Sequence, residues 1–165
     1  MNKTFWKNKK ILITGHTGFK GSWLTLILNN LGAKVVGYAL NPISKPNFFD
    51  GCGLNKFIFK DYRSDIKNLK KLYMVTKKFE PEIVFHLAAQ SSVLVSYKNS
   101  LDTIATNVIG TTNMLEVIKS CRSIKSAVIV TTDKVYQNLE QRIKFREDSS
   151  LGGHDIYSGS KAACE

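Results

Sequence analysis

The chain has 165 residues, with 43% hydrophobic and 22% charged residues, which are ordinary proportions for one globular domain. It shows neither the ~20-residue apolar run of a membrane helix nor a signal peptide, so we expect a cytoplasmic protein without a membrane partner. The net charge is +11, but the lysines are spread along the chain without a basic recognition motif, so we do not expect a nucleic-acid partner. The three cysteines, Cys52, Cys121 and Cys164, form no metal-ligand pattern and are expected to be reduced thiols.

A predicted strand over residues 11–14 leads into three glycines spaced G-x-x-G-x-x-G, and a helical pattern follows over residues 22–30. This order of strand, glycine turn and helix is the context of a dinucleotide-binding site. We expect Gly15 to allow the sharp turn, Gly18 to let backbone N–H groups approach a diphosphate, and Gly21 to allow close packing of helix on sheet. An ordinary tight loop is the alternative interpretation.

A second strand is predicted over residues 34–39, and residues 38–41 at its end contain no acid or arginine to contact an adenosine ribose. The sequence therefore does not discriminate between NAD and NADP. Proline and glycine predict a loop over residues 41–55, and a third strand is predicted over residues 56–59. Just beyond it, Asp61 is expected to accept a hydrogen bond from an adenine amino group, with a turn or helix cap as the alternative.

The remaining chain alternates helices and strands. They are predicted over residues 66–79 (helix), 82–87 (strand), 100–120 (helix) and 127–131 (strand), and another helix begins near residue 156. The strand ending at residue 87 is almost entirely apolar, as in a parallel strand covered on both faces. This alternation predicts an α/β fold with a doubly wound parallel sheet.

Two polar residues interrupt this apolar pattern. His86 lies in the fourth strand, where we interpret it as a packed side chain and not a metal ligand. Asn107 lies within the apolar face of the long helix, and a buried amide requires hydrogen-bond partners. We therefore expect Asn107 to brace the neighbouring strand ends.

A Tyr-x-x-x-Lys pair, Tyr157 and Lys161, falls in the last predicted helix, where positions i and i+4 share one face. A nearby ammonium favours phenolate over phenol, so Lys161 is expected to lower the pKa of Tyr157. Tyr157 would then take a proton from a sugar hydroxyl while a hydride leaves the same carbon, and Thr132 would hydrogen-bond that oxygen. A surface pair without catalytic function is the alternative.

The glycine turn, Thr132 and the Tyr/Lys pair occur in the order typical of the extended short-chain dehydrogenase/reductase family, which the chain resembles. Within that family it is similar to the CDP-glucose 4,6-dehydratases. The matching segments are residues 15–24, 36–40, 86–90, 106–111, 132–134 and 152–158. Lys134 is the most specific position, because related dTDP-glucose dehydratases carry a glutamate there.

The resemblance implies a Rossmann-type NAD-binding domain over residues 1–165, a CDP-glucose substrate and a homo-oligomer. The implied reaction oxidises C4 of the glucose, eliminates water across C5 and C6, and returns the hydride to C6. Tyr157 would be the base for O4, Asp133 would protonate the leaving C6 hydroxyl, and Lys134 would assist at C5 as a base or an electrostatic stabiliser. Asp133 would then need a pKa raised by burial, and Lys134 as a base would need a lowered one. The implied cofactor-binding residues are Gly15, Thr17, Gly18, Phe19, Lys20, Gly21, Asp61, Tyr62, Leu87, Ala88, Ala89, Gln90, Asn107, Tyr157 and Lys161.

Enzymes of this family have roughly as much chain again, with later strands and a C-terminal sugar-nucleotide domain. We therefore expect an incomplete domain that lacks the sugar-nucleotide domain, in which the helix of Tyr157 and Lys161 frays and the outer edge of the fifth strand is exposed. Two alternatives stay open. One is an epimerase or reductase acting on another nucleotide sugar, and the other is a non-catalytic nucleotide-binding module.

Overall fold

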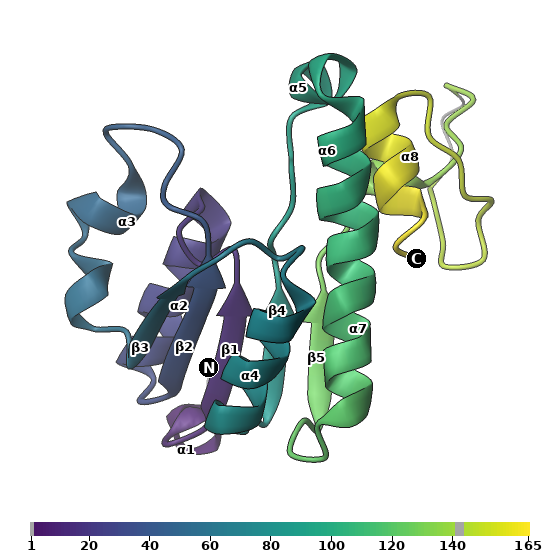
Figure 1. Ribbon diagram of the computed structural model, residues 1–165. Helices are drawn as coiled ribbons and strands as arrows, with labels where there is room; N and C mark the ends of the chain where they lie inside the picture. The colour runs from purple at the N-terminus through teal and green to yellow at the C-terminus, as the bar shows by residue number, and fades with distance from the viewer. Residues whose placement is uncertain (1, 141–143) are drawn as a thin grey trace.

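A parallel sheet of five strands, in the order β3-β2-β1-β4-β5, forms the centre of the computed structural model, which describes residues 2–140 and 144–165 (Figure 1). The strands are β1 (Lys10–Thr14), β2 (Lys34–Ala39), β3 (Lys60–Arg63), β4 (Ile83–His86) and β5 (Ser126–Ile129). The strand order reverses at β1, because the chain adds β2 and β3 on one side and β4 and β5 on the other. This is the predicted doubly wound arrangement, in which ligands bind at the carboxyl ends of the strands beside the reversal.

Helices connect the strands and lie on both faces of the sheet (Figure 1). The α-helices are α1 (Lys3–Trp6), α2 (Phe19–Asn30), α3 (Phe48–Gly51), α4 (Leu69–Phe79), α5 (Val93–Lys98), α6 (Ser100–Ile104), α7 (Gly110–Ser120) and α8 (Ile156–Ala162). Two short 3₁₀ helices are η1 (Leu54–Lys56) and η3 (Asp133–Val135), and η2 (Ala105–Ile109) is a π-helix. None of the helices in the described part of the chain is long and apolar enough to cross a membrane.

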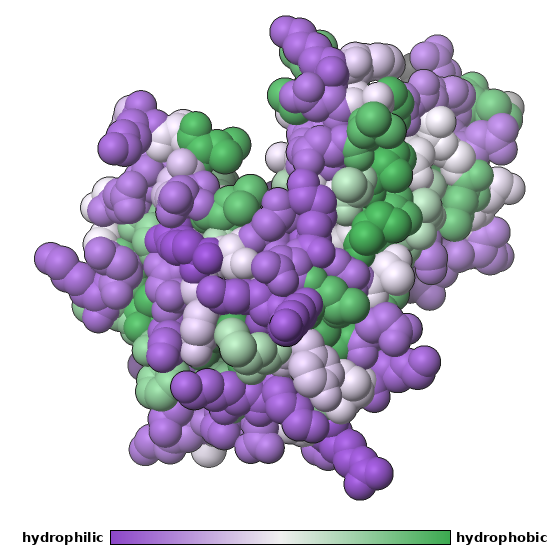
Figure 2. All heavy atoms as spheres, in the orientation of Figure 1, coloured by the Kyte–Doolittle hydropathy of each residue, from purple (hydrophilic) through white to green (hydrophobic). Residues whose placement is uncertain are grey.

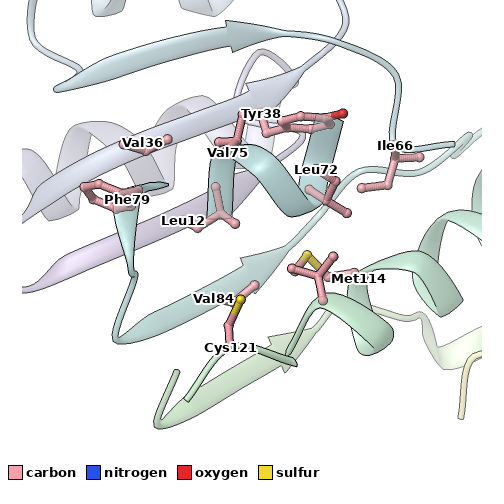
Figure 3. Close-up of a cluster of buried hydrophobic side chains, with 11 residues drawn as sticks. Leu12, Val36, Tyr38, Ile66, Leu72, Val75, Phe79, Val84, Met114 and Cys121 are labelled. Atoms are coloured by element: carbon pink, nitrogen blue, oxygen red, sulfur yellow. The ribbon is translucent and has the colours of Figure 1, made fainter. Parts of the chain in front are cut away.

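Alternate residues of β1 point to opposite faces of the sheet and belong to two separate hydrophobic cores. Leu12 packs with residues of α4 and α7, among them Leu72 and Met114, on one face of the sheet (Figure 3). Ile11 and Ile13 pack with Leu28 of α2 on the other face. This division follows because successive side chains of a strand point to opposite faces of the sheet. Since both faces of β1 are buried, its sequence is apolar throughout.

The predicted loop over residues 41–55 contains helical turns, α3 and η1. Phe49 and Leu54 are both buried and anchor these turns to the domain. The third strand was predicted too early, since Phe57 and Phe59 are exposed and β3 begins only at Lys60. Ile58 between them is buried, but the pairing with β2 begins at Lys60, so this apolar run is a turn that precedes the strand.

Other helix boundaries also differ from the prediction, since α4 begins at Leu69 instead of residue 66 and α1 was not predicted. α2 begins at Phe19 instead of the predicted residue 22, because the Gly18 carbonyl already accepts the Ser22 N–H at 2.8 Å. α5 was not predicted, and Ser92 caps it by accepting the Val95 N–H at 3.3 Å. The predicted helix over residues 100–120 is present but contains the π-helical η2 between α6 and α7.

Candidate functional site

The glycine turn between β1 and α2 uses its three glycines differently. Gly15 has a φ of +72°, and a Cβ there would lie 2.7 Å from the Ala88 backbone nitrogen. A Cβ at Gly21 would overlap the Gly15 carbonyl oxygen. Gly18 has φ −74° and ψ 165°, which any residue adopts, and the nearest atom to a Cβ there is the Gly15 carbonyl oxygen at 3.4 Å. The fold therefore requires Gly15 and Gly21, whereas it does not require Gly18.

Gly18 is also the N-cap of α2, and no side chain of the described residues caps this helix end by hydrogen bonding. Its neighbour Thr17 donates its hydroxyl to the Leu40 carbonyl at 3.0 Å, which ties the turn to the end of β2. Phe19 and Lys20, in the first turn of α2, are exposed. An uncapped helix N-terminus beside a lysine favours an anion.

Asp61 lies within β3 and contacts His16 of the glycine turn. The His16 Nε2 and the Asp61 Oδ1 are 2.9 Å apart, and Arg63 donates its Nε and Nη2 to the Asp61 Oδ2 at 3.0 and 2.6 Å. Partial burial acts to raise the pKa of the Asp61 carboxyl, but these hydrogen bonds and the two neighbouring charges hold it below the usual value. The suggested turn or cap role for Asp61 is therefore wrong, while contact with an adenine stays a prediction.

His16, the partner of Asp61, was not predicted as a site residue. Its ring is fully buried, lies edge-on to Phe49 with ring centroids 5.4 Å apart, and fills the space beside Gly37, where a Cβ would overlap it. A histidine between glycines of the turn was the available signal. Tyr62, the neighbour of Asp61 in β3, is half-buried and packs against the core on the α4 side.

His86 at the end of β4 is a packed side chain, as predicted. Its Nδ1 lies 2.7 Å from the Thr14 hydroxyl and its Nε2 lies 3.1 Å from the Thr111 hydroxyl. Burial, with a smaller contribution from the charge of Lys161, lowers the pKa of His86 to about 4. The described residues contain no cluster of three or more possible metal ligands.

The segment that follows β4 lies against the glycine turn, as its predicted role requires. The Thr14 hydroxyl accepts the N–H groups of Leu87 and Ala88, each at 3.2 Å. Ala89 and Gln90 continue this segment and are half-buried. The backbone of Leu87 and Ala88 thereby lies close to Gly15 at the carboxyl end of the sheet.

Asn107 lies in η2 and braces two elements. Its Oδ1 accepts the Gln90 N–H at 2.8 Å, and its Nδ2 donates to the Gln90 carbonyl at 3.0 Å and to the Ser160 hydroxyl at 2.8 Å. The expected bracing of a strand end is confirmed. The bond to Ser160 in α8 was not predicted, because it depends on the π-helical geometry of η2.

Tyr157 and Lys161 lie in α8 and are 9% and 4% exposed. Lys161 donates its Nζ to the Val130 carbonyl at 2.8 Å, just beyond β5, and burial lowers the pKa of its ammonium group. Asp155 caps α8 by accepting the Ser158 N–H at 2.9 Å. The expectation that this helix frays is wrong, because its cap and its buried side chains hold it against η2, η3 and the residue that follows β5.

Thr132, Asp133 and Lys134 follow β5 in the turn η3. The Thr132 hydroxyl donates to the Asp133 Oδ1 at 3.0 Å, and both Asp133 and Lys134 are exposed. The expected burial of Asp133 is therefore not present, because η3 lies beyond the outer strand of the sheet. Thr132 follows β5, and α8, which carries Tyr157 and Lys161, packs against η3 at the same end of the sheet. The glycine turn follows β1 along the same edge, with β4 between it and β5.

The chain was compared with known protein families and structures. The family described as GDP-mannose 4,6 dehydratase matches residues 12–165. A CDP-glucose 4,6-dehydratase of Salmonella typhimurium is 44% identical over 165 residues, which are 100% of this chain and 46% of that protein. A dTDP-D-glucose 4,6-dehydratase of Dictyostelium discoideum is 34% identical over 95% of this chain and 39% of its own length.

Solved structures show the same fold. A dTDP-glucose 4,6-dehydratase from Bacillus anthracis in complex with NAD is 28% identical with a TM-score of 0.76, over 94% of this chain and 48% of that one. An epimerase from Methanothermobacter thermautotrophicus has a TM-score of 0.83 at 26% identity, over 98% of this chain and 47% of that one. The chain thus spans about half the length of the curated relatives and structures it matches.

Proposed function

Because the chain belongs to the GDP-mannose 4,6-dehydratase family, we propose that residues 1–165 form the NAD-binding Rossmann domain of a CDP-glucose 4,6-dehydratase. The observation that carries this proposal is the 44% identity with the Salmonella CDP-glucose 4,6-dehydratase along the whole chain. The resemblance of Thr132-Asp133-Lys134 to the cytidine enzymes supports the same substrate.

The residues of the glycine turn fit a dinucleotide. A Cβ at Gly18 would meet only the Gly15 carbonyl oxygen, in van der Waals contact, the N-terminus of α2 is uncapped by any described side chain, and Lys20 is exposed beside it. The first N–H groups of α2 would bind the diphosphate, since the Gly18 N–H already donates to the Gly15 carbonyl at 3.1 Å. Asp61, held by His16 and Arg63, would accept the adenine amino group, and Tyr62 would lie beside the base.

At the other end of the site, Tyr157 and Lys161 would serve the oxidation of the sugar. NAD, when bound, supplies the acceptor and later the donor of the hydride. Tyr157 would take the proton from O4 of the glucose, and the Thr132 hydroxyl would hydrogen-bond the same oxygen. Lys161, anchored by the Val130 carbonyl, would place its positive charge beside Tyr157.

Elimination of water would require the residues of η3. Oxidation of C4 acidifies the proton on C5, and Asp133 would protonate the C6 hydroxyl as it leaves. Lys134 would assist at C5, either as the base that takes the C5 proton or by stabilising the negative charge that develops as this proton leaves. Asp133 needs to be protonated for this step, and a nucleotide sugar that covered the exposed η3 would supply the burial that raises a carboxyl pKa.

Binding of NAD to this chain, measured by calorimetry, tests the cofactor proposal. We expect saturable binding that Gly18→Val weakens more than tenfold without loss of folding, because the added side chain would fill the diphosphate approach. Gly51→Val is the matched control, since no atom lies within 4 Å of a Cβ there and Gly51 lies in α3, outside the turn. If the chain and its Gly18→Val variant bound NAD with equal affinity, the diphosphate would not bind at this turn.

Incubation with CDP-glucose and NAD tests the reaction, with mass spectrometry to detect the loss of one water. A 4-keto-6-deoxy product from CDP-glucose, in excess over that from dTDP-glucose, supports the proposal. A product of unchanged mass but altered stereochemistry at C4 would indicate an epimerase, and net reduction would indicate a reductase.

The exposure of Asp133 and Lys134 favours a second candidate, a nucleotide-binding module without turnover. In that case Asp133 and Lys134 have no solvent-excluded pocket in which to carry out the elimination. NAD binding with normal affinity, together with no conversion of any nucleotide sugar, would favour this candidate over the dehydratase.

A second copy of the chain would cover an apolar face of the long helix. Four exposed apolar side chains follow one another along α6, η2 and α7: Leu101, Ile104, Ile109 and Leu115. Figure 2 shows an apolar band over this part of the molecule, and helices with such a band pair in oligomers. Sedimentation should show a dimer that Leu101→Lys dissociates and the control Leu139→Lys does not, since Leu139 is exposed elsewhere.

A further inference from the structure

Thr14 and His86 lie side by side at the ends of two neighbouring strands. β1 and β4 pair in parallel, and Thr14 is in register with His86. The strand order reverses at β1, so these two strand ends border the edge at which a doubly wound sheet binds its ligand. Both side chains are buried, and buried polar groups require hydrogen-bond partners.

The Thr14 hydroxyl has three neighbours within hydrogen-bonding distance. The N–H groups of Leu87 and Ala88 each lie 3.2 Å from its oxygen, and the His86 Nδ1 lies 2.7 Å from it. The two N–H groups can only donate, so they occupy the two lone pairs of the oxygen. Of the three neighbours, the His86 Nδ1 alone can accept the one proton of the hydroxyl.

This direction of the hydrogen bond fixes the proton on the other side of the His86 ring. Burial, with a smaller contribution from the charge of Lys161, lowers the pKa of His86 to about 4, so the ring is neutral near pH 7. A neutral imidazole with a bare Nδ1 carries its proton on Nε2. The Nε2 accordingly donates to the Thr111 hydroxyl oxygen in α7, 3.1 Å away.

The Thr14 oxygen holds the backbone segment that follows β4. The Leu87 N–H also donates to the Thr14 carbonyl at 3.1 Å, whereas the Ala88 N–H bonds, among the described residues, to the Thr14 hydroxyl alone. Ala88 lies against the glycine turn, because a Cβ at Gly15 would lie 2.7 Å from its nitrogen. The position of this segment beside the turn therefore depends on the ability of the Thr14 oxygen to accept.

We propose that His86 is a positioning residue for the cofactor. Protonated on Nε2, it accepts the proton of the Thr14 hydroxyl, so the Thr14 oxygen stays available to the N–H groups of residues 87 and 88. The inference rests on the proposed function, in which residues 87–90 border the NAD. If His86 carried its proton on Nδ1 instead, the ring and both N–H groups would all donate toward one oxygen, and the Ala88 N–H would lose its partner.

Nitrogen NMR of the histidine rings tests the tautomer in the chain without NAD. Near pH 7 we expect the His86 Nδ1 to give the resonance of an unprotonated ring nitrogen and the Nε2 to give that of an N–H. The chain has three histidines, so the signals that disappear in His86→Asn identify this ring. A His86 ring protonated on Nδ1, or on both nitrogens, would overturn the inference.

Two substitutions of His86 separate positioning from packing. The asparagine Oδ1 takes the place of Nδ1 and can accept the Thr14 proton, whereas the longer glutamine places its amide where Nε2 lies. We expect NAD affinity to stay within about twofold in His86→Asn and to fall about tenfold in His86→Gln, which loses the hydrogen bond to Thr14. A role in packing alone predicts the reverse order, because asparagine leaves the larger cavity. Equal losses or the reverse order would overturn the proposal.

Two substitutions of Thr14 repeat the test from β1. Thr14→Ser keeps the hydroxyl and should keep the NAD affinity, whereas Thr14→Val keeps the shape without the hydroxyl and should weaken binding about tenfold. Thr76→Val is the matched control and should leave the affinity unchanged, since this buried hydroxyl donates to the Leu72 carbonyl within α4. An equal loss in Thr76→Val would overturn the role of the Thr14 hydroxyl.

The failure of this inference can be distinguished from the failure of the proposed function. If the unmodified chain did not bind NAD, the cofactor proposal would fail. The ring tautomer and the hydrogen exchange of the Ala88 N–H would still decide whether His86 holds this segment. Faster exchange of that N–H in His86→Gln than in His86→Asn would support the positioning role, and equal exchange would overturn it.

Discussion

The glycine turn and the η3 turn both follow strands at the carboxyl edge of the sheet, but they are packed differently. Gly15 and Gly21 are in contact with backbone atoms of neighbouring segments, and His16 beside them is fully buried. Asp133 and Lys134 in η3 are exposed. In the first turn the residues of the motif are also residues of the core, whereas in the second they contribute little to packing.

This difference determines which substitutions can report on function. A change at Gly15 or Gly21 alters folding and binding together, whereas at Gly18 the backbone is unstrained and a Cβ would make only a van der Waals contact with the Gly15 carbonyl oxygen. A change at Asp133 or Lys134 of η3 leaves the fold intact and reports on chemistry alone, whereas Val135 of the same turn is buried. α8 lies between these cases, because its functional side chains are buried but its hydrogen bonds can be removed one at a time.

The largest expected effect falls on the glycine turn. Gly21→Ala should lower the free energy of unfolding by about 3 kcal/mol or more, because its Cβ would overlap a backbone oxygen that cannot move aside. Gly18→Ala should stay within about 0.5 kcal/mol of the unmodified chain. Urea unfolding measures both, and similar losses for the two variants would contradict the division between them.

The next effect concerns pH. The pKa of His86 is about 4 in the folded chain and about 6.5 in the unfolded chain. The unfolded chain therefore binds a proton first as the pH falls, so the stability that neutral His86 provides is complete above pH 6.5 and is lost toward pH 4. The loss should be on the order of 3 kcal/mol.

Unfolding measured between these pH values checks this prediction. His86→Gln should flatten the dependence, because glutamine has no proton to gain. The exposed His154→Gln is the matched control and should retain the slope. An unchanged slope in His86→Gln would assign the pH dependence to other groups.

A smaller effect is expected at the brace between β4 and α8. Asn107→Ala leaves the Gln90 backbone and the Ser160 hydroxyl without their partner, which should cost about 2 kcal/mol. Hydrogen exchange should show the loss concentrated in α8. Uniform loss of protection across the sheet would mean that Asn107 supports the fold as a whole.

The smallest effect on stability belongs to η3. Asp133→Asn and Lys134→Met should each change the free energy of unfolding by less than about 0.5 kcal/mol, because both side chains are exposed. If the proposed reaction is correct, Asp133→Asn should nevertheless reduce conversion of CDP-glucose at least about 100-fold. A marked loss of stability would place Asp133 in the packing of the domain.

The sequence predicted the parts of the fold that repeat a pattern. Apolar strands alternating with amphipathic helices sufficed for the sheet, and the glycine spacing located the turn after β1. Local patterns failed where burial depended on distant residues. Phe57 and Phe59 resemble a strand but are exposed, while Phe49 anchors a segment whose prolines and glycines indicate a loop.

For the site, too, local motifs could be predicted from the sequence, whereas contacts between distant segments could not. Positions of Tyr157, Lys161 and Thr132 at the end of β5 were expected from the order of the motifs. Contacts that join segments far apart in the chain, such as His16 with Asp61 and Asn107 with Ser160, have no local signature. Neither does the exposure of Asp133, which depends on what packs over η3.

The π-helical η2 has a consequence for the length of the chain at this point. A π-turn holds one residue more than an α-turn, and each residue advances an α-helix by about 100°. The extra residue of a π-turn leaves the α-helical segments on either side in phase, so deleting one residue from η2 would keep Leu101 on the exposed side and Met114 against the sheet. It would, however, close the turn from which Asn107 reaches Gln90 and Ser160. The loss of one residue here would therefore test the Asn107 brace and not the packing of the long helix.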